Sequence, residues 1–200
     1  MTKRENVVSN KNIPTRNLAP CKKEEADDRM LLHVKDISKS GLRKVTVITV
    51  DTDVVIIALC AFWDLSLDEL WIEFGTGLSK IWIPIHTLAY QLGEELCRAM
   101  PFWYAFTGVD TVSQFLGKGK KTAWNTWKQF PKITDTFIRL SSFSPPTEAD
   151  MSMIERFVVL LYDKKSDCTK VNDCRRQLFT KKGLSLIHIS EPTRRVLIAY

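Results

Sequence analysis

The sequence predicts an α/β fold in which a parallel sheet is flanked by helices and followed by a helical C-terminal part. Three observations lead to this prediction. The β-branched run 45–50 is typical of a strand that is buried on both faces, as in parallel sheets covered by helices. Apolar residues recur at helical spacing before this run, and a buried apolar helix is expected after it. Near the C-terminus, the segments 147–162 and 167–182 both have the character of helices.

The amino-acid composition limits which classes of protein this chain can belong to. The 200 residues are 44% hydrophobic and 10% aromatic, which is enough for one sizeable core, and we expect a single domain over residues 21–183. Residues 1–20 are polar and show no period, so they are expected to be a tail or a truncated N-terminus. The net charge of +6 is compatible with a polyanionic partner such as nucleic acid.

Location and membrane contact are constrained by the apolar runs and the cysteines. The longest uncharged apolar run, 54–63, is too short for the roughly 20 residues of a membrane-spanning helix, so we expect no membrane partner. No secretory signal is recognisable. The five cysteines include no C-x-x-C pair and are interpreted as reduced thiols. We therefore expect an intracellular protein, either nuclear or cytoplasmic.

The elements follow in order. The spacing of Ala26, Met30, Val34 and Ile37 predicts a helix over 23–40, and Gly41 stands where such a helix would stop. After the strand at 45–50, the apolar segment 54–65 is expected to be a buried helix that packs on the sheet.

Two further strands are expected before the chain becomes helical. The segments 69–74 and 80–85 predict strands or a hairpin, with the turn at Gly75 to Gly77. The stripe of Leu88, Leu92, Leu96 and Ala99 predicts a helix over 85–100, and Pro101 is expected either to end it or to start the next helix. The aromatic stretch 102–108 is expected to be core. In the later helices, Phe157, Leu160 and Leu161 are expected to face inward.

Acidic residues gather in three places that suit a metal site. Asp51 and Asp53 follow the predicted strand at its carboxyl end, where ligands collect in open α/β sheets, and Asp53 could also cap the next helix. The other acidic residues are Glu24, Glu25, Asp27 and Asp28 at a helix start, and Asp110 after a glycine and valine. Oxygen ligands of this kind suit Mg²⁺ or Mn²⁺, and two such ions about 4 Å apart can drive phosphodiester hydrolysis.

Each cluster also has a purely structural interpretation. Asp51 can be a turn residue, Asp53 only a helix cap, and the acidic first turn at 24–28 only a complement to the helix dipole.

A basic segment predicts contact with phosphate. Residues 117–132 contain five lysines and no acidic residue, and Gly117 and Gly119 expose backbone N–H groups beside Lys118, Lys120 and Lys121. The alternative is that these lysines merely solvate a turn. The nearby Trp124 and Trp127 are either core residues or platforms on which bases stack.

The order of four segments resembles the flap-endonuclease branch of the PIN-like nucleases, and within that superfamily a repeatedly duplicated animal group. The segments are 19–27 (APCKKEEAD), 49–54 (TVDTDV), 106–111 (FTGVDT) and 117–123 (GKGKKTA). The resemblance covers about residues 20–183 and implies a PIN-like fold with two Mg²⁺ or Mn²⁺ ions. It also implies that the partner is nucleic acid and that the chemistry is phosphodiester hydrolysis.

The resemblance assigns roles residue by residue. The metal ligands would be Glu25, Asp27, Asp51, Asp53 and Asp110, of which Asp51, Asp53 and Asp110 would be catalytic. The helix–hairpin–helix that grips the nucleic-acid backbone would be formed by Gly117, Lys118, Gly119, Lys120 and Lys121, continuing to Ala123.

This chain also departs from the family pattern. Val109 replaces a cysteine, Asp27 replaces a glutamate, and residues 1–20 contain no aspartate for the metal ligand that the family takes from a first strand. The alternative function is therefore a catalytically degenerate PIN-like domain that binds nucleic acid or another protein without cutting.

Other sites are not indicated. Gly119 and Lys120 are followed by lysine rather than Ser or Thr, so no P-loop and no nucleotide cofactor are expected. The three histidines have no zinc-ligand spacing, and no hydrolase triad is recognisable. The segment from Gly183 to Arg195 resembles a translated sequencing adapter, so residues 184–200 are expected to be a non-native tail, the alternative being a genuine β-prone tail.

Overall fold

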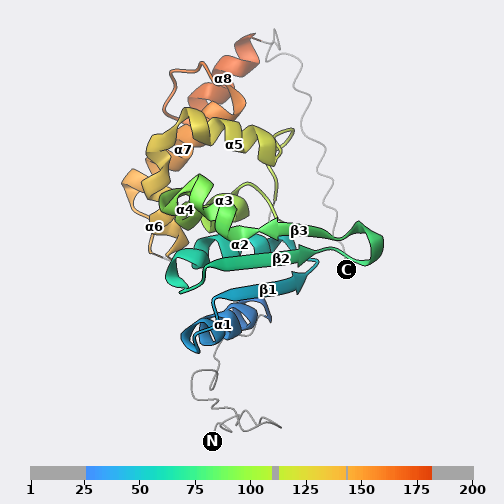
Figure 1. The fold of residues 1–200 in the computed structure, drawn as a ribbon. Coiled ribbons are helices and arrows are strands. Elements are labelled where there is room, and N and C mark those ends of the chain that lie inside the picture. Colours follow the sequence, from blue (N-terminus) through green and yellow to red (C-terminus); the bar gives the residue numbers. More distant parts are fainter. Residues whose placement is uncertain (1–25, 110–112, 143, 182–200) are drawn as a thin grey trace, which may run out of the picture. The chain divides into compact units, whose positions relative to one another are not determined.

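The computed structural model describes residues 26–109, 113–142 and 144–181 (Figure 1). The chain divides into two compact units, and each is described by itself. Unit 1 runs to residue 114 and adds residues 134–145, whereas unit 2 contains residues 115–133 and those from 146 onward. The α/β class expected from the sequence is confirmed. The PIN-like identity of the fold stays a prediction.

The first described element of unit 1 is the expected helix, α1, at Ala26–Lys39. Gly41 follows at a φ of +90°, a left-handed conformation that ends the helix at little cost because glycine has no Cβ. Val34 on α1 is 3% exposed and belongs to the core of the unit.

Among the described residues, the sheet has three strands in the order β1-β2-β3 (Figure 1). β1 is Lys44–Thr49, β2 is Glu69–Phe74 and β3 is Ile81–Pro84. β1 and β2 are parallel as expected, whereas β2 and β3 are antiparallel, so the expected parallel sheet is in fact mixed, and the segments 69–74 and 80–85 form the hairpin that the sequence allowed. The residues between β2 and β3 are too few for the crossover that parallel neighbours require, and they form a hairpin instead.

β1 is buried on one face only, contrary to the sequence prediction. Val47 is 6% exposed and lies in the core with Leu70 and Ile72 of β2, whereas Ile48 is 67% exposed and Val50 is 64% exposed. Side chains alternate between the two faces of a strand. The β-branched residues on both faces of this run favour a strand, but only those on one face are buried.

The helix after β1 is α2, at Thr52–Ala61, and a short 3₁₀ turn, η1, continues at Phe62–Asp64. Val54, Ala58 and Leu59 are buried, as expected for a helix that packs on the sheet. Arg98 ties this end of α2 to a later helix, because its guanidinium donates to Asp64 Oδ1 at 2.9 Å and to Glu94 Oε1 at 2.7 Å.

The single helix expected over 85–100 is two helices. α3 is Ile85–Leu92 and α4 is Glu94–Phe106, and Gly93 breaks them at a φ of +82°. Pro101 lies inside α4 rather than at its end, although it lacks the N–H that would bond to the Cys97 carbonyl.

The packing around α4 offsets the cost of this proline. α4 packs closely with α6, Thr134–Ser141, where Phe102 contacts Phe137 with ring centroids 5.6 Å apart. The aromatic stretch expected to be core is part of α4 and only partly buried: Trp103 is buried, whereas the other aromatic residues, Phe102, Tyr104 and Phe106, are half-buried.

Unit 2 is helical. It contains α5 at Lys120–Gln129, the 3₁₀ turn η3 at Pro131–Ile133, α7 at Glu148–Tyr162 and α8 at Val171–Lys181. Phe157 and Leu161 face the interior as expected, but Leu160 is only half-buried and Val159 takes the buried position beside it.

The last helix starts later than predicted. α8 begins at Val171 rather than at residue 167, because Glu155 of α7 bonds to the Val171 backbone and fixes the start of the helix there. In the described part of the chain, every helix is too short or too polar to cross a bilayer.

Candidate functional site

Asp51 and Asp53 lie at the carboxyl end of β1, as the sequence predicted. Asp51, not Asp53, is the N-cap of α2: its backbone is extended, with φ −97° and ψ 128°, and its Oδ1 accepts from the Asp53 N–H at 2.9 Å. The expectation that Asp53 caps the helix is therefore wrong, because the cap stands one residue before Thr52, where α2 starts. The Asp51 N–H donates to Thr49 Oγ1 at 3.0 Å, which fixes the turn.

The Asp51 side chain is exposed, whereas Asp53 in the first turn of α2 is half-buried. Capping uses only one of the two Asp51 carboxylate oxygens. The second oxygen, Oδ2, therefore lies outside the capping bond.

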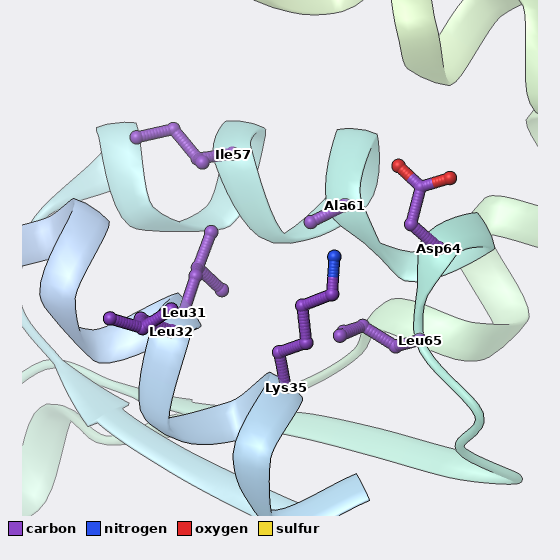
Figure 2. A pocket seen from close by; sticks show the side chains of 7 residues that line it. All are labelled: Leu31, Leu32, Lys35, Ile57, Ala61, Asp64 and Leu65. Carbon is purple, nitrogen blue, oxygen red and sulfur yellow. The ribbon is translucent and has the colours of Figure 1, made fainter. Parts of the chain in front are cut away.

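The helix packing of unit 1 adds Asp27 to this end of the sheet. Leu31 of α1 and Ile57 of α2 line the same pocket, and Figure 2 shows Leu31 pointing from α1 toward α2. On a helix, residues four apart lie one above the other on the same face. Asp27 precedes Leu31 by four residues, and Asp53 precedes Ile57 by four.

The same pocket gives the direction of the two helices. Leu31 and Lys35, in chain order along α1, line it together with Ile57, Ala61 and Asp64, in chain order along α2 and η1. In Figure 2 the Leu31 end of α1 lies near Ile57 and the Lys35 end near Asp64, so the helices run in the same direction. Their first turns, which carry Asp27 and Asp53, therefore lie at the same end of unit 1.

Three of the five predicted metal ligands are thus brought to one end of β1: Asp27, Asp51 and Asp53. The other two, Glu25 and Asp110, lie outside the described residues. Within the residues that the structure describes, no three His, Cys, Asp or Glu side chains are already placed to hold a metal ion together. The purely structural role of Asp51 as a helix cap is real, and it is compatible with a second role for its other oxygen.

The predicted phosphate-binding loop starts α5 in unit 2. Gly117 has a φ of +68°, and the Lys118 N–H donates to the Phe115 carbonyl at 2.9 Å to close the turn. Gly119 is the N-cap of α5, so Lys120 and Lys121 occupy its first turn.

Lysines in the first turn are unfavourable for an isolated helix, because the positive end of the dipole lies there. A bound anion would relieve this repulsion and satisfy the first N–H groups of the helix. α5 directly follows the loop in the sequence, but residues 110–112 before the loop lie outside the described residues, so the predicted helix–hairpin–helix stays a prediction.

The aromatic residues beside the lysines were only partly anticipated. Trp127 is 2% exposed and packs edge-to-face with Trp124 at 5.2 Å, so it is a core residue and no stacking platform. The aromatic partner of the loop is Tyr162, whose ring centroid lies 5.4 Å from Lys118 Nζ. No sequence pattern indicated this pair, because Tyr162 lies at the end of α7, far from the loop along the chain.

The pocket between α1 and α2 has a volume of about 300 Å³ (Figure 2). Its wall is mostly apolar, with Lys35 and Asp64 as its charged residues. Asp64 is held by Arg98, and this contact raises the pKa of the Arg98 guanidinium above its usual value, with a further contribution from Glu94. We assign this pocket a structural role, because its charged wall is tied to the packing of α4.

Comparison with known proteins adds no assignment to this geometry. No protein-family model matches the chain, and no curated protein or solved structure matches it. Each unit carries its own candidate residues: Asp27, Asp51 and Asp53 in unit 1, and the loop from Gly117 to Lys121 in unit 2.

Proposed function

We propose that this chain is a PIN-like, divalent-metal-dependent nuclease domain that hydrolyses phosphodiester bonds of structured or single-stranded nucleic acid. One observation carries the proposal: Asp51 and Asp53 share the turn at the carboxyl end of β1, and the first turn of α1, which carries Asp27, lies at the same end of unit 1. That edge is where ligands gather in α/β sheets.

The chemistry of the donor set fits Mg²⁺ or Mn²⁺. The three side chains offer only oxygen, and Asp51 is exposed while keeping one oxygen outside its capping bond. Asp27, Asp51 and Asp53, with Glu25 and Asp110, would hold two ions. When bound, such ions lower the pKa of a coordinated water and neutralise charge on the leaving oxygen of a phosphodiester.

The chain's own groups would orient these ligands and attract the substrate. The cap between Asp51 and the Asp53 N–H holds the turn at the end of β1 rigid, so the two carboxylates keep their spacing. In unit 2, the loop from Gly117 to Lys121 supplies backbone N–H groups and lysines for the phosphates.

The test is cleavage of labelled single-stranded and flap oligonucleotides by the purified protein with Mg²⁺, with Mn²⁺ and with EDTA. We expect cleavage only with metal and its loss in Asp51→Asn and Asp53→Asn. Asp68→Asn is the matched control, because Asp68 is an exposed carboxylate at the opposite end of the sheet, before β2. Equal cleavage by all three variants would exclude the proposed catalytic cluster.

Metal uptake separates the nuclease from the binding-only alternative. Titration of the protein with Mn²⁺ in a calorimeter should give a saturable signal that Asp51→Asn abolishes. Oligonucleotide binding with no metal uptake and no cleavage would instead identify a degenerate domain that only binds nucleic acid.

A further inference from the structure

A second pocket opens in unit 2 and has no assigned role. Its volume is about 570 Å³, in the range of small-molecule sites. Its walls come from α7, α8 and the two residues before the Gly117 loop. Three of the lining residues are aromatic and one is charged: Phe115, Tyr162, Phe179 and Arg175.

The aromatic walls are accessible. Tyr162 is 38% exposed and Phe179 is 44% exposed, while Leu116 at the rim is 89% exposed. Phe115 and Tyr162 meet edge-to-face with ring centroids 6.5 Å apart, so the Tyr162 ring is held in place without being covered. Exposed apolar side chains gathered around a cavity are typical of a surface that binds a flat or apolar ligand.

The charge next to the pocket selects among such ligands. Phe115 and Leu116 lead directly into Gly117 and Lys118, and Lys118 Nζ lies 5.4 Å from the centroid of the Tyr162 ring. Residues 115–133 contain five lysines and no acidic residue. Arg175 adds a further cation on the α8 side. The occupant should therefore carry an apolar, stackable group joined to a negative charge.

We propose that this pocket takes one unstacked base of a single-stranded nucleic acid, while the adjoining phosphates lie along Gly117 to Lys121. The ligand class rests on the proposed function, but the inference concerns binding alone and requires no metal. The base would stack on Tyr162 and Phe179. Because the walls offer few hydrogen-bonding groups, recognition would tolerate any base, as stacking platforms do.

The test is binding in EDTA, where metal-dependent cleavage cannot occur. Fluorescence anisotropy gives the affinity for a labelled single-stranded oligonucleotide, and a 2-aminopurine base within it reports stacking through quenched emission. Tyr162→Ala and Phe179→Ala should each weaken binding roughly 5- to 100-fold, the range that corresponds to losing one stacked base. Both should also reduce the quenching.

Two variants act as controls. Tyr162→Phe keeps the ring and should retain both affinity and quenching. Met151→Ala removes a side chain that is 54% exposed on the same helix, away from the pocket, and should change neither signal. Circular dichroism confirms that each variant is folded, and Phe179→Ala tests the pocket if Tyr162→Ala does not fold.

The outcomes distinguish this inference from the proposed function. Quenching without any cleavage in metal would support the base pocket and reject the nuclease. Cleavage by the wild type, with no quenching and with unchanged affinity of Tyr162→Ala and Phe179→Ala, would overturn the pocket and leave the nuclease standing. Equal affinity for a fully paired duplex, or pocket-dependent binding of an acidic peptide in place of the oligonucleotide, would also overturn it.

Discussion

The Glu155 carboxylate of α7 accepts a hydrogen bond at 2.9 Å from the backbone N–H of Val171, the first residue of α8. Lys170 Nζ lies 3.0 Å from the other oxygen of the same carboxylate. A side chain from one helix thus satisfies the start of the next, where N–H groups have no partner within the helix. The bond from Val171, followed by the contact with Lys170, lowers the pKa of Glu155.

Glu155→Gln should lower the melting temperature of unit 2 near neutral pH. The folded state holds Glu155 at a pKa below that of the unfolded chain, so the carboxylate stabilises the fold fully above the ordinary glutamate pKa. This contribution fades as pH falls from there through the lowered value.

Thermal denaturation between pH 3 and pH 7 tests this prediction. The difference in melting temperature between wild type and Glu155→Gln should become smaller toward the acidic end of the range. Asp167→Asn, which removes an exposed charge in the nearby loop, is the control and should show a smaller gap. A gap that is independent of pH would contradict the assignment.

Asp51 should show separable structural and metal-binding roles. Asparagine caps helices about as well as aspartate, so Asp51→Asn should cost less than about 1 kcal/mol, whereas Asp51→Ala loses the bond to the Asp53 N–H and should cost roughly 0.5–2 kcal/mol. Added Mn²⁺ should raise the melting temperature of the wild type and of neither variant. Stabilisation of Asp51→Asn by Mn²⁺ would show that Asp51 is a cap and no ligand.

The lysines of the Gly117 loop should track phosphates rather than read bases, since lysine lacks the bidentate fork with which arginine recognises guanine. Replacing Lys118, Lys120 and Lys121 by alanine should weaken binding to all sequences alike. It should also flatten the dependence of log K on log salt by about 0.7–0.9 for each lost contact.

Binding titrations at several salt concentrations measure this slope. The double variant Lys164→Ala with Lys165→Ala removes exposed lysines from another loop of unit 2 and should leave the slope unchanged. If the triple variant also keeps the wild-type slope, the lysines only solvate the turn.

A fourth prediction follows from the burial of β1 on one face only. Val47→Thr places a hydroxyl in the core and should cost roughly 1–3 kcal/mol, whereas Ile48→Thr on the exposed face should stay within about 0.5 kcal/mol of the wild type. Both variants keep a β-branched side chain, so strand propensity is matched. Urea denaturation compares them, and equal losses would mean that both faces of β1 are covered.

Local sequence patterns predicted most of the helices and strands. Where these predictions failed, tertiary packing determined the structure instead. The spacing of Met30 and Val34 correctly predicted α1, and the turn at Gly75 correctly predicted the hairpin. Both signals lie within short segments of the chain. The predicted helix boundaries were wrong at Gly93, which separates α3 from α4, and at Pro101, which lies inside α4. The helical stripe runs across Gly93 without a gap, and the packing of α4 on α6 compensates for the proline within the helix.

The candidate site was predictable in residue type but only partly in arrangement. Asp51 and Asp53 follow a strand, so their place at its end could be read from the sequence. The placement of Asp27 at the same end of unit 1 depends on how α1 packs against α2, which periodicity alone does not specify. The pocket around Tyr162 and Phe179 could not be foreseen, because its walls meet only after α7 and α8 fold together.

The exposed face of β1 also bears on solubility. Residues 45–50 form six consecutive uncharged, strongly β-prone residues, and β1 is an edge strand among the described strands. Such segments template amyloid-like stacking unless charged residues interrupt the pairing. Lys44 and Asp51 flank this segment directly and act as its gatekeepers. Neutralising both at once would therefore favour fibrillar aggregation of the unfolded chain, even where each single substitution leaves the folded protein intact.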